Sequence, residues 1–142
     1  MSKLDGMKLE NQLCFPLYAA SREVIKRYRP FLDTLDLTYT QYIVMVVFWE
    51  KKTASVKELG RILHLDSGTL TPVLKSLEAK GFVQRSRSAE DERVLIVTVT
   101  PEGESLQEKA KDVPAHIRRS IKLTDAEAVR LHALLYKLLG DT

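Results

Sequence analysis

Residues 65–78 carry the pattern that most constrains the fold of this chain. Leu70, Val73 or Leu74, and Leu77 recur at spacings that place them on one face of a helix. The remaining faces of its first two turns hold small hydroxyl residues, one glycine and one lysine: Ser67, Gly68, Thr69, Thr71, Lys75 and Ser76. Such a surface can lie close to a polyanion and bond phosphates and base edges. The alternative is a Ser/Thr-rich capping segment before an ordinary helix, and the neighbouring segments decide between the two.

The segments on both sides favour DNA binding. Ser55 and Glu58 have capping-box spacing and open a short helix over residues 56–63, which a turn at 64–66 joins to the helix above. Two short helices joined in this way form a helix-turn-helix. Gly81 is placed to end the second helix in a left-handed conformation. Residues 82–87 and 94–100 then read as two strands around a polar turn, which is the plan of a winged helix.

Pro72 leaves the start of the second helix open. By local rules Thr71 would be the N-cap and Pro72 the first helical residue, which leaves Thr69 in the loop. If the helix instead begins at Ser67, Pro72 removes one backbone hydrogen bond inside it.

Helical patterns flank the winged helix. Apolar residues at steps of three and four predict a helix over residues 8–29 that Pro16 either kinks or delays, and Pro30 is expected to break it before a short piece over 30–35. A capping box opens an almost wholly apolar helix over residues 39–50. After the hairpin we expect a helix over 101–117, bent at Pro114, and a last helix opened by a capping box at 124–127.

The hairpin carries three arginines, Arg85, Arg87 and Arg93, which we expect to cluster with Asp91. Arginine at a hairpin tip can enter the minor groove, where negative potential is concentrated. Asp91, two residues before Arg93, can hold that guanidinium in place. A solvated charged turn is the alternative, but the position directly after a helix-turn-helix favours a DNA contact.

Composition narrows the function further. The 142 residues predict a single domain, 1–142, and fractions of 44% hydrophobic and 29% charged residues are typical of globular proteins. With no membrane-length apolar run and no signal peptide, we expect a cytoplasmic protein without a membrane partner. A net charge of only +3 means that DNA binding depends on where the basic residues lie. His64, His116 and His132 lack metal-ligand spacing, and no catalytic set is apparent, so we expect no metal, no cofactor and no enzyme.

The chain resembles the MarR family of bacterial transcription regulators and, within it, the one-cysteine OhrR repressors that sense organic hydroperoxides. The matching segments are ENQLCF at residues 10–15, Tyr18, Tyr28, LTY at 37–39, LDSGTLTP at 65–72 and EDER at 90–93. The resemblance implies a mainly α fold with a small β-hairpin wing. In it a winged helix-turn-helix over residues 39–100 is flanked by dimerisation helices over 8–35 and 101–140.

The resemblance also implies partners. It implies a homodimer on an inverted-repeat operator in double-stranded DNA, with a recognition helix in the major groove and a wing that uses Asp91 and Arg93. The expected DNA-binding residues are Ser67, Gly68, Thr69, Thr71, Pro72, Lys75, Arg85, Arg87, Asp91 and Arg93.

The reactive cysteine of the family maps onto Cys14, the single cysteine of the chain. The family's hydrogen-bonding tyrosines map onto Tyr28 and Tyr39, which the resemblance places against the thiol of the other subunit; Tyr18, one turn after Cys14, is expected to line the same pocket. Oxidation of a thiolate gives a sulfenic acid. This can end as a mixed disulfide with a low-molecular-weight thiol, an inter-chain disulfide, a sulfenamide or an overoxidised acid. Without the resemblance, a lone cysteine reads as a small buried hydrophobe.

Three functions follow from these features. The first is a homodimeric repressor that oxidation of Cys14 by organic hydroperoxides or related oxidants releases from its operator. The second is a MarR-type regulator that answers a small aromatic ligand, or a broader stress or virulence regulator, in which Cys14 is not the main switch. The third is a thiol peroxidase, which the winged helix and the lack of a resolving cysteine disfavour.

Overall fold

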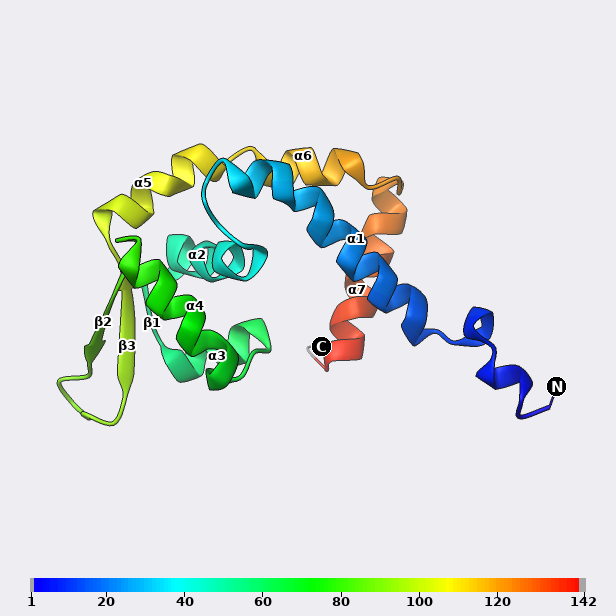
Figure 1. The fold of residues 1–142 in the computed structure, drawn as a ribbon, viewed down its shortest axis with the longest axis horizontal. Coiled ribbons are helices and arrows are strands. Elements are labelled where there is room, and N and C mark those ends of the chain that lie inside the picture. The colour runs from blue at the N-terminus through cyan, green and yellow to red at the C-terminus, as the bar shows by residue number, and fades with distance from the viewer. Residues whose placement is uncertain (1, 141–142) are drawn as a thin grey trace.

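The computed structural model describes residues 2–140 and has two parts (Figure 1). Helices α2, α3 and α4 and a small sheet form a winged body, while the N-terminal half of α1 and helix α7 project away from it. Helices α5 and α6 run along the top of Figure 1 and connect the two parts. The elements are η1 (Asp5–Met7), η2 (Leu9–Asn11), α1 (Cys14–Asp33), α2 (Tyr39–Lys51), β1 (Thr53–Ser55), α3 (Val56–Leu63), α4 (Ser67–Ala79), β2 (Val83–Arg87), β3 (Leu95–Val99), α5 (Pro101–Ala110), α6 (Val113–Ser120) and α7 (Asp125–Leu139). The mainly α fold with a hairpin wing is confirmed.

The sheet has the order β1-β3-β2, and both pairings are antiparallel. In the hairpin Val83 pairs with Val99 and Arg87 with Leu95. The sequence did not predict β1, because three residues are too few for an alternating pattern to be recognised. Ser55 ends β1 and also caps α3, since its hydroxyl accepts a hydrogen bond from the Glu58 N–H at 3.0 Å. The strand therefore fixes where the helix-turn-helix begins.

The core lies between α2, α4 and the sheet. Helix α2 is apolar on most sides, and Phe48 and Met45 are fully buried. The Trp49 indole N–H donates to the Gly103 carbonyl at 2.8 Å, which joins α2 to α5. Helix α4 contributes the three leucines of its predicted apolar face, Leu70, Leu74 and Leu77. Burial of that face leaves the opposite face of α4 exposed.

One buried polar side chain holds α4 to the start of α2. Gln41 is 7% exposed, and its amide N–H donates to the Ser76 hydroxyl at 2.9 Å. Its carbonyl oxygen accepts from the Thr38 N–H at 2.9 Å and from the Lys80 ammonium at 3.2 Å. Lys80 also donates to the backbone carbonyl of Asp36, in the turn that follows α1. These bonds connect the end of α1 to the C-terminal end of α4.

Helix α4 begins at Ser67, so the start at Pro72 that local rules favoured is wrong. The Asp66 carboxylate is the N-cap and accepts from the Thr69 N–H at 2.7 Å. Pro72 therefore lies inside the helix and costs it one backbone bond. Gly81 follows the helix with a φ of +84°, as predicted.

The flanking helices differ from the prediction at their prolines. Helix α1 begins at Cys14, not at residue 8, and Pro16 lies in its first turn, where a missing N–H leaves no intrahelical bond unmade. The break expected at Pro30 is wrong, because α1 continues through it to Asp33. The helix expected over 101–117 is divided at Lys111 and Asp112, before Pro114, which occupies the favourable first turn of α6. No helix within residues 2–140 is long and apolar enough to cross a membrane.

Gly103 marks the closest approach of α5 to the hairpin. A Cβ at this position would overlap the carbonyl oxygen of Phe82 and lie 2.8 Å from Val99 Cγ2. We therefore expect Gly103→Ala to lower the free energy of unfolding by about 1–3 kcal/mol, measured by chemical denaturation. Gly6→Ala is the control, because its Cβ would meet nothing within 4 Å. Equal unfolding free energies for the two variants would contradict this packing.

Candidate nucleic-acid interface and cysteine region

The exposed face of α4 carries every residue predicted for its DNA contact. All of them are exposed: Ser67, Gly68, Thr69, Thr71, Pro72 and Lys75. The Thr71 hydroxyl donates to the Ser67 carbonyl at 2.7 Å. The Thr69 N–H donates to the Asp66 carboxylate, and this bond, followed by the Thr69 side chain, holds the pKa of that carboxyl below its usual range. The N-terminal end of α4 and the turn of the hairpin lie along the same lower edge in Figure 1.

The hairpin turn holds Asp91 and Arg93 together, as predicted. Arg93 Nε donates to Asp91 Oδ1 and Nη2 to Oδ2, each at 3.1 Å, and the Arg93 N–H donates to Oδ1 at 3.0 Å. These bonds, those from the side chain above all, lower the pKa of Asp91. The Arg93 side chain is nevertheless 90% exposed. Its guanidinium is thus oriented and still free to meet a partner.

Arg85 does not join this pair. It lies on β2, where its N–H donates to Glu78 Oε2 at 3.1 Å and its Nη2 lies 2.9 Å from Oε1. The Arg85 side chain and N–H together lower the pKa of Glu78. This bridge fixes the hairpin against the last turn of α4. Sequence reasoning missed Glu78, because no local spacing rule relates a helical residue to a strand residue beyond the turn. Arg87, at the end of β2, is exposed.

Tyr28 and Tyr39, both predicted for the sensing site, are in contact. Their ring centroids lie 4.9 Å apart at an edge-to-face angle of 63°. Tyr42 joins them, with its ring centroid 5.6 Å from that of Tyr28. Burial, followed by the neighbouring phenols, raises the pKa of Tyr28 to about 12. The hydroxyl therefore keeps its proton near neutral pH and remains a hydrogen-bond donor.

The raised pKa of Tyr28 predicts a loss of stability in alkali. The unfolded phenol ionises near 10.0 and the folded one near 12, so its contribution is fully present below pH 10 and is lost as the pH rises toward 12. Between pH 9 and pH 11, native protein should lose more unfolding free energy than Tyr28→Phe, measured in urea. Tyr136→Phe, at a residue of α7 that is 45% exposed, is the control. Parallel curves for native protein and Tyr28→Phe would contradict the prediction.

Cys14 is exposed at the start of α1 and lies far along that helix from Tyr28. Tyr28 is fourteen residues further along the same helix, which corresponds to about 21 Å at 1.5 Å per residue. Tyr18 is 57% exposed, and the Arg22 guanidinium lies over its ring at 5.5 Å. Within one chain, the predicted sensing residues Cys14 and Tyr28 are therefore not brought together.

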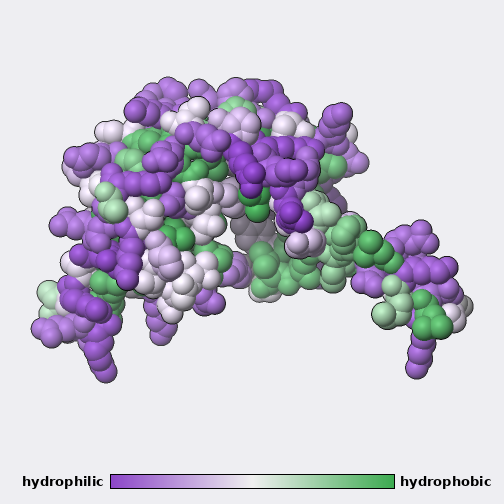
Figure 2. Space-filling model, viewed as in Figure 1, coloured by the Kyte–Doolittle hydropathy of each residue, from purple (hydrophilic) through white to green (hydrophobic). Residues whose placement is uncertain are grey.

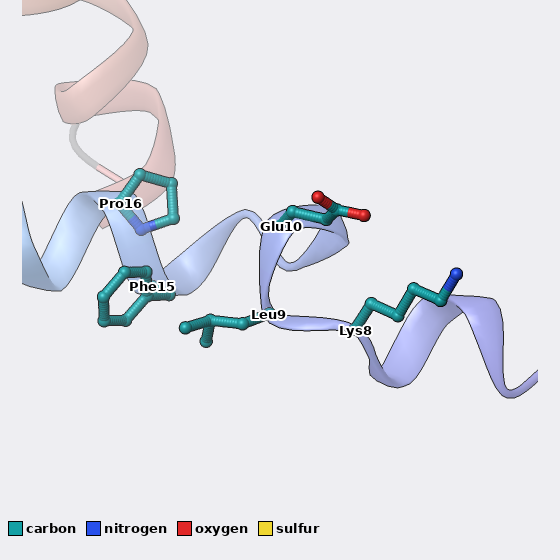
Figure 3. A pocket seen from close by; sticks show the side chains of 5 residues that line it. All are labelled: Lys8, Leu9, Glu10, Phe15 and Pro16. Atoms are coloured by element: carbon teal, nitrogen blue, oxygen red, sulfur yellow. The ribbon is translucent and has the colours of Figure 1, made fainter.

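A shallow hollow lies beside Cys14. It has a volume of about 640 Å³ and is lined by Lys8, Leu9, Glu10, Phe15 and Pro16. Figure 3 shows the Leu9 side chain pointing toward the Phe15 ring, with the charged ends of Lys8 and Glu10 turned away. Phe15, the residue after Cys14, therefore contributes to an apolar surface. Within residues 2–140, no group of three acidic, histidine or cysteine side chains is arranged to hold a metal ion.

An apolar groove separates α1 from α7. Its volume is about 610 Å³, and its walls are Leu13, Pro16, Leu17, Ala20, Ser21, Val24, Ile25, Tyr39, Leu131 and Leu135. No residue of α7 from Asp125 to Leu139 is buried, and Leu131, Leu134 and Leu138 are between 45% and 66% exposed. Figure 2 shows hydrophobic residues gathered over this part of the molecule. We call this surface, formed by the apolar residues of α1 and α7, the apolar face.

Comparisons with known proteins show to which family the chain belongs. Residues 26–111 match the family model of the transcriptional regulators SarA and Rot. The chain belongs to this SarA/Rot family. Over 138 residues it is 49% identical to the organic hydroperoxide resistance transcriptional regulator of Bacillus subtilis strain 168, an alignment that covers 97% of this chain and 94% of the relative. This confirms the resemblance to the OhrR branch of MarR-type regulators, and identifies the family members as regulators and not enzymes.

Solved structures of AbfR, a protein of Staphylococcus epidermidis, have the same fold. Reduced AbfR bound to DNA has a TM-score of 0.80 and 36% identity, with 98% of both chains covered. Disulfide-formed AbfR has a TM-score of 0.66 and 37% identity, with 96% of both chains covered. These similarities confirm the winged-helix fold over almost the entire chain.

Proposed function

We propose that this regulator is a homodimeric repressor, released from its operator when organic hydroperoxides or related oxidants oxidise Cys14. The observation that carries the proposal is the position of Cys14. The thiol is exposed at the first turn of α1, beside the apolar face that a partner subunit would cover. The Bacillus subtilis relative is named for organic hydroperoxide resistance, and the AbfR structures include DNA-bound and disulfide forms.

In this proposal the winged helix, residues 39–100, contacts DNA. The exposed face of α4 lies in the major groove, and Lys75 supplies its positive charge. The exposed guanidinium of Arg93 and the exposed Arg87 at the end of β2 contact the backbone or the minor groove. Arg85 acts indirectly, because its bridge to Glu78 fixes the angle between wing and recognition helix.

Dimerisation through residues 8–35 and 101–140 explains two further features. Large apolar side chains of α1 and α7, such as Leu13 at 82% and Leu138 at 66% exposure, would be removed from water. A second copy packed against α1 would also bring its own Tyr28 and Tyr39 to Cys14. Within one chain Tyr28 lies about 21 Å along the helix from Cys14 and cannot reach it.

The proposed reaction needs only the thiol and the oxidant. The Cys14 thiolate attacks one oxygen of the hydroperoxide, the O–O bond breaks, and the alkoxide leaves and takes up a proton as an alcohol. Sulfur is oxidised to sulfenic acid while the peroxide is reduced. A low-molecular-weight thiol can then condense with it and release water. A bulky adduct in a dimer seam would move the two recognition helices, which must meet half-sites about 34–36 Å apart.

The test is operator release by oxidant. The probe is a fluorescent duplex selected from a randomised inverted-repeat library by the reduced protein. One equivalent of cumene hydroperoxide with a small thiol should weaken native binding at least tenfold and leave Cys14→Ser unchanged. Mass spectrometry should locate the adduct on Cys14. Equal release of both proteins would remove the sensing role while leaving DNA binding intact.

The groove of about 610 Å³ favours one second candidate. In this candidate, a regulator of this fold binds a small aromatic ligand in the groove, or acts as a broader stress or virulence regulator. Cys14 is then not the main switch. In that case an aromatic carboxylate, such as salicylate, should release Cys14→Ser from the same probe in the absence of oxidant. No release at millimolar ligand would reject this candidate.

A further inference from the structure

We infer that the recognition helix α4 reads DNA mainly through oxygen acceptors. Its exposed face then selects bases that present an exocyclic amino group in the major groove, adenine N6 or cytosine N4. The inference rests on the proposed placement of α4 in the major groove and adds which chemical groups it reads there.

Thr71, on this face, has already used its hydroxyl hydrogen. It donates that hydrogen to the Ser67 carbonyl at 2.7 Å. A hydroxyl has one hydrogen and two lone pairs, so the Thr71 side chain can offer only lone pairs to a base. It is an acceptor, although its residue type also permits donation.

Pro72 adds a second acceptor, because proline has no backbone N–H. In an α-helix the N–H at this position would donate to the carbonyl of Gly68, four residues earlier, and proline has no N–H. The ring also crowds that carbonyl, which tilts such groups away from the helix axis. Gly68 and Pro72 are both exposed, and Gly68 has no side chain to cover its own carbonyl. The Gly68 oxygen therefore lacks the N–H donor that it would otherwise have within the helix.

The four bases differ in whether they offer these acceptors a hydrogen-bond donor in the major groove. Adenine presents a donor at N6 and cytosine at N4, whereas guanine presents only acceptors at O6 and N7. Oxygen lone pairs opposite guanine would leave both sides unpaired and desolvated. The donors at this end of the helix are the Ser67 hydroxyl and the backbone N–H groups of Ser67 and Gly68, which have no acceptor within the helix, and the Lys75 ammonium lies two turns further on. Bases opposite the Gly68 carbonyl and the Thr71 hydroxyl should therefore be adenine or cytosine.

Base analogues in the selected duplex test this directly. Purine in place of adenine, or pyrimidin-2-one in place of cytosine, removes the amino group. At one or more positions of each half-site this should weaken binding at least fivefold. Replacement of adenine by 7-deazaadenine keeps the amino group and removes the N7 acceptor, and should change binding less than twofold. The opposite pattern, with N7 needed and the amino groups dispensable, would overturn the inference.

Protein variants identify which atoms of α4 cause the loss of affinity when a base amino group is removed. Thr71→Val keeps the shape of the side chain and removes its oxygen. Pro72→Ala returns an N–H to the Gly68 carbonyl, so the variant should melt at the same or a higher temperature and still bind less selectively. Each variant should lose the amino-group effect at one position. Thr34→Val is the matched control, since the Thr34 hydroxyl donates to the Phe31 carbonyl at 2.6 Å at the far end of α1.

The outcomes separate this inference from the proposed function. If both variants retain every amino-group effect of the native protein, the acceptor assignment is wrong although DNA binding stands. If the reduced native protein selects no duplex from the library, the proposed function fails and the inference fails with it.

Discussion

Leu131→Glu should convert the protein to monomers and weaken operator binding at least a hundredfold. Leu131 is 45% exposed on α7 and lines the groove against α1. Full burial of a leucine contributes about 1.5–3 kcal/mol, and a twofold interface contains the residue twice. A carboxylate in its place would also be taken out of water without a partner. A hundredfold loss corresponds to about 2.7 kcal/mol, well within these contributions.

Light scattering after gel filtration and fluorescence anisotropy on the selected duplex measure the two effects. Ala133→Glu is the matched control: it adds the same charge to an exposed residue of α7, two positions away and on another side of the helix. This control should remain dimeric and bind the duplex like the native protein. A dimeric Leu131→Glu with native affinity would show that the apolar face does not hold the subunits together.

Local chemistry accounts for most of the elements that were predicted. The Thr38 and Thr124 capping boxes begin α2 and α7 as expected, because the reciprocal bonds lie within four residues of sequence. Gly81 ends the recognition helix for the same kind of local reason, a φ that only glycine adopts freely. Such features depend on neighbouring residues alone and can be read directly from the sequence.

The errors arise where distant packing overrides a local preference. Helix α1 continues beyond Pro30 because the residues that follow are held in the core, Leu32 at 2% exposure and Leu35 at 7%. Strand β1 exists only because β3 lies beside it. Two residues compete to cap the recognition helix. Burial of Leu70 favours Asp66 over Thr71, because Leu70 lies in the helix, one turn before Leu74, only when the helix begins at Ser67.

In the candidate site, too, contacts between neighbouring residues were predictable and contacts between distant residues were not. The Asp91–Arg93 pair was predictable, because both residues lie in one turn. The Glu78–Arg85 bridge was not, since it joins a helix to a strand across the fold. The choice of Tyr28 and Tyr39 as sensing residues came from the family resemblance, but the contact between their rings is a finding of the structure, as no spacing rule relates α1 to α2. The environment of Cys14 depends on a second copy of the chain in our proposal, so a single sequence pattern cannot supply it.

Arg93→Ala should weaken operator binding by ten- to a hundredfold. The guanidinium is 90% exposed, yet two bonds to the Asp91 carboxylate hold its orientation. Because the side chain is already ordered, less conformational entropy is lost when it meets DNA. Because a dimer has two wings, the substitution removes this contact twice. The slope of log affinity against log salt should also fall by about 2, one for each lost cationic contact.

Asp91→Asn tests the orientation of the Arg93 guanidinium separately from its charge. The amide keeps one acceptor but weakens the hold on Arg93, so affinity should fall less than in Arg93→Ala while the salt slope stays near that of the native protein. Lys122→Ala, which removes a cation between α6 and α7, controls for net charge and should have little effect. If Arg93→Ala binds within twofold of the native protein at every salt concentration, the wing does not contact the duplex. The recognition helix alone would then have to supply the affinity.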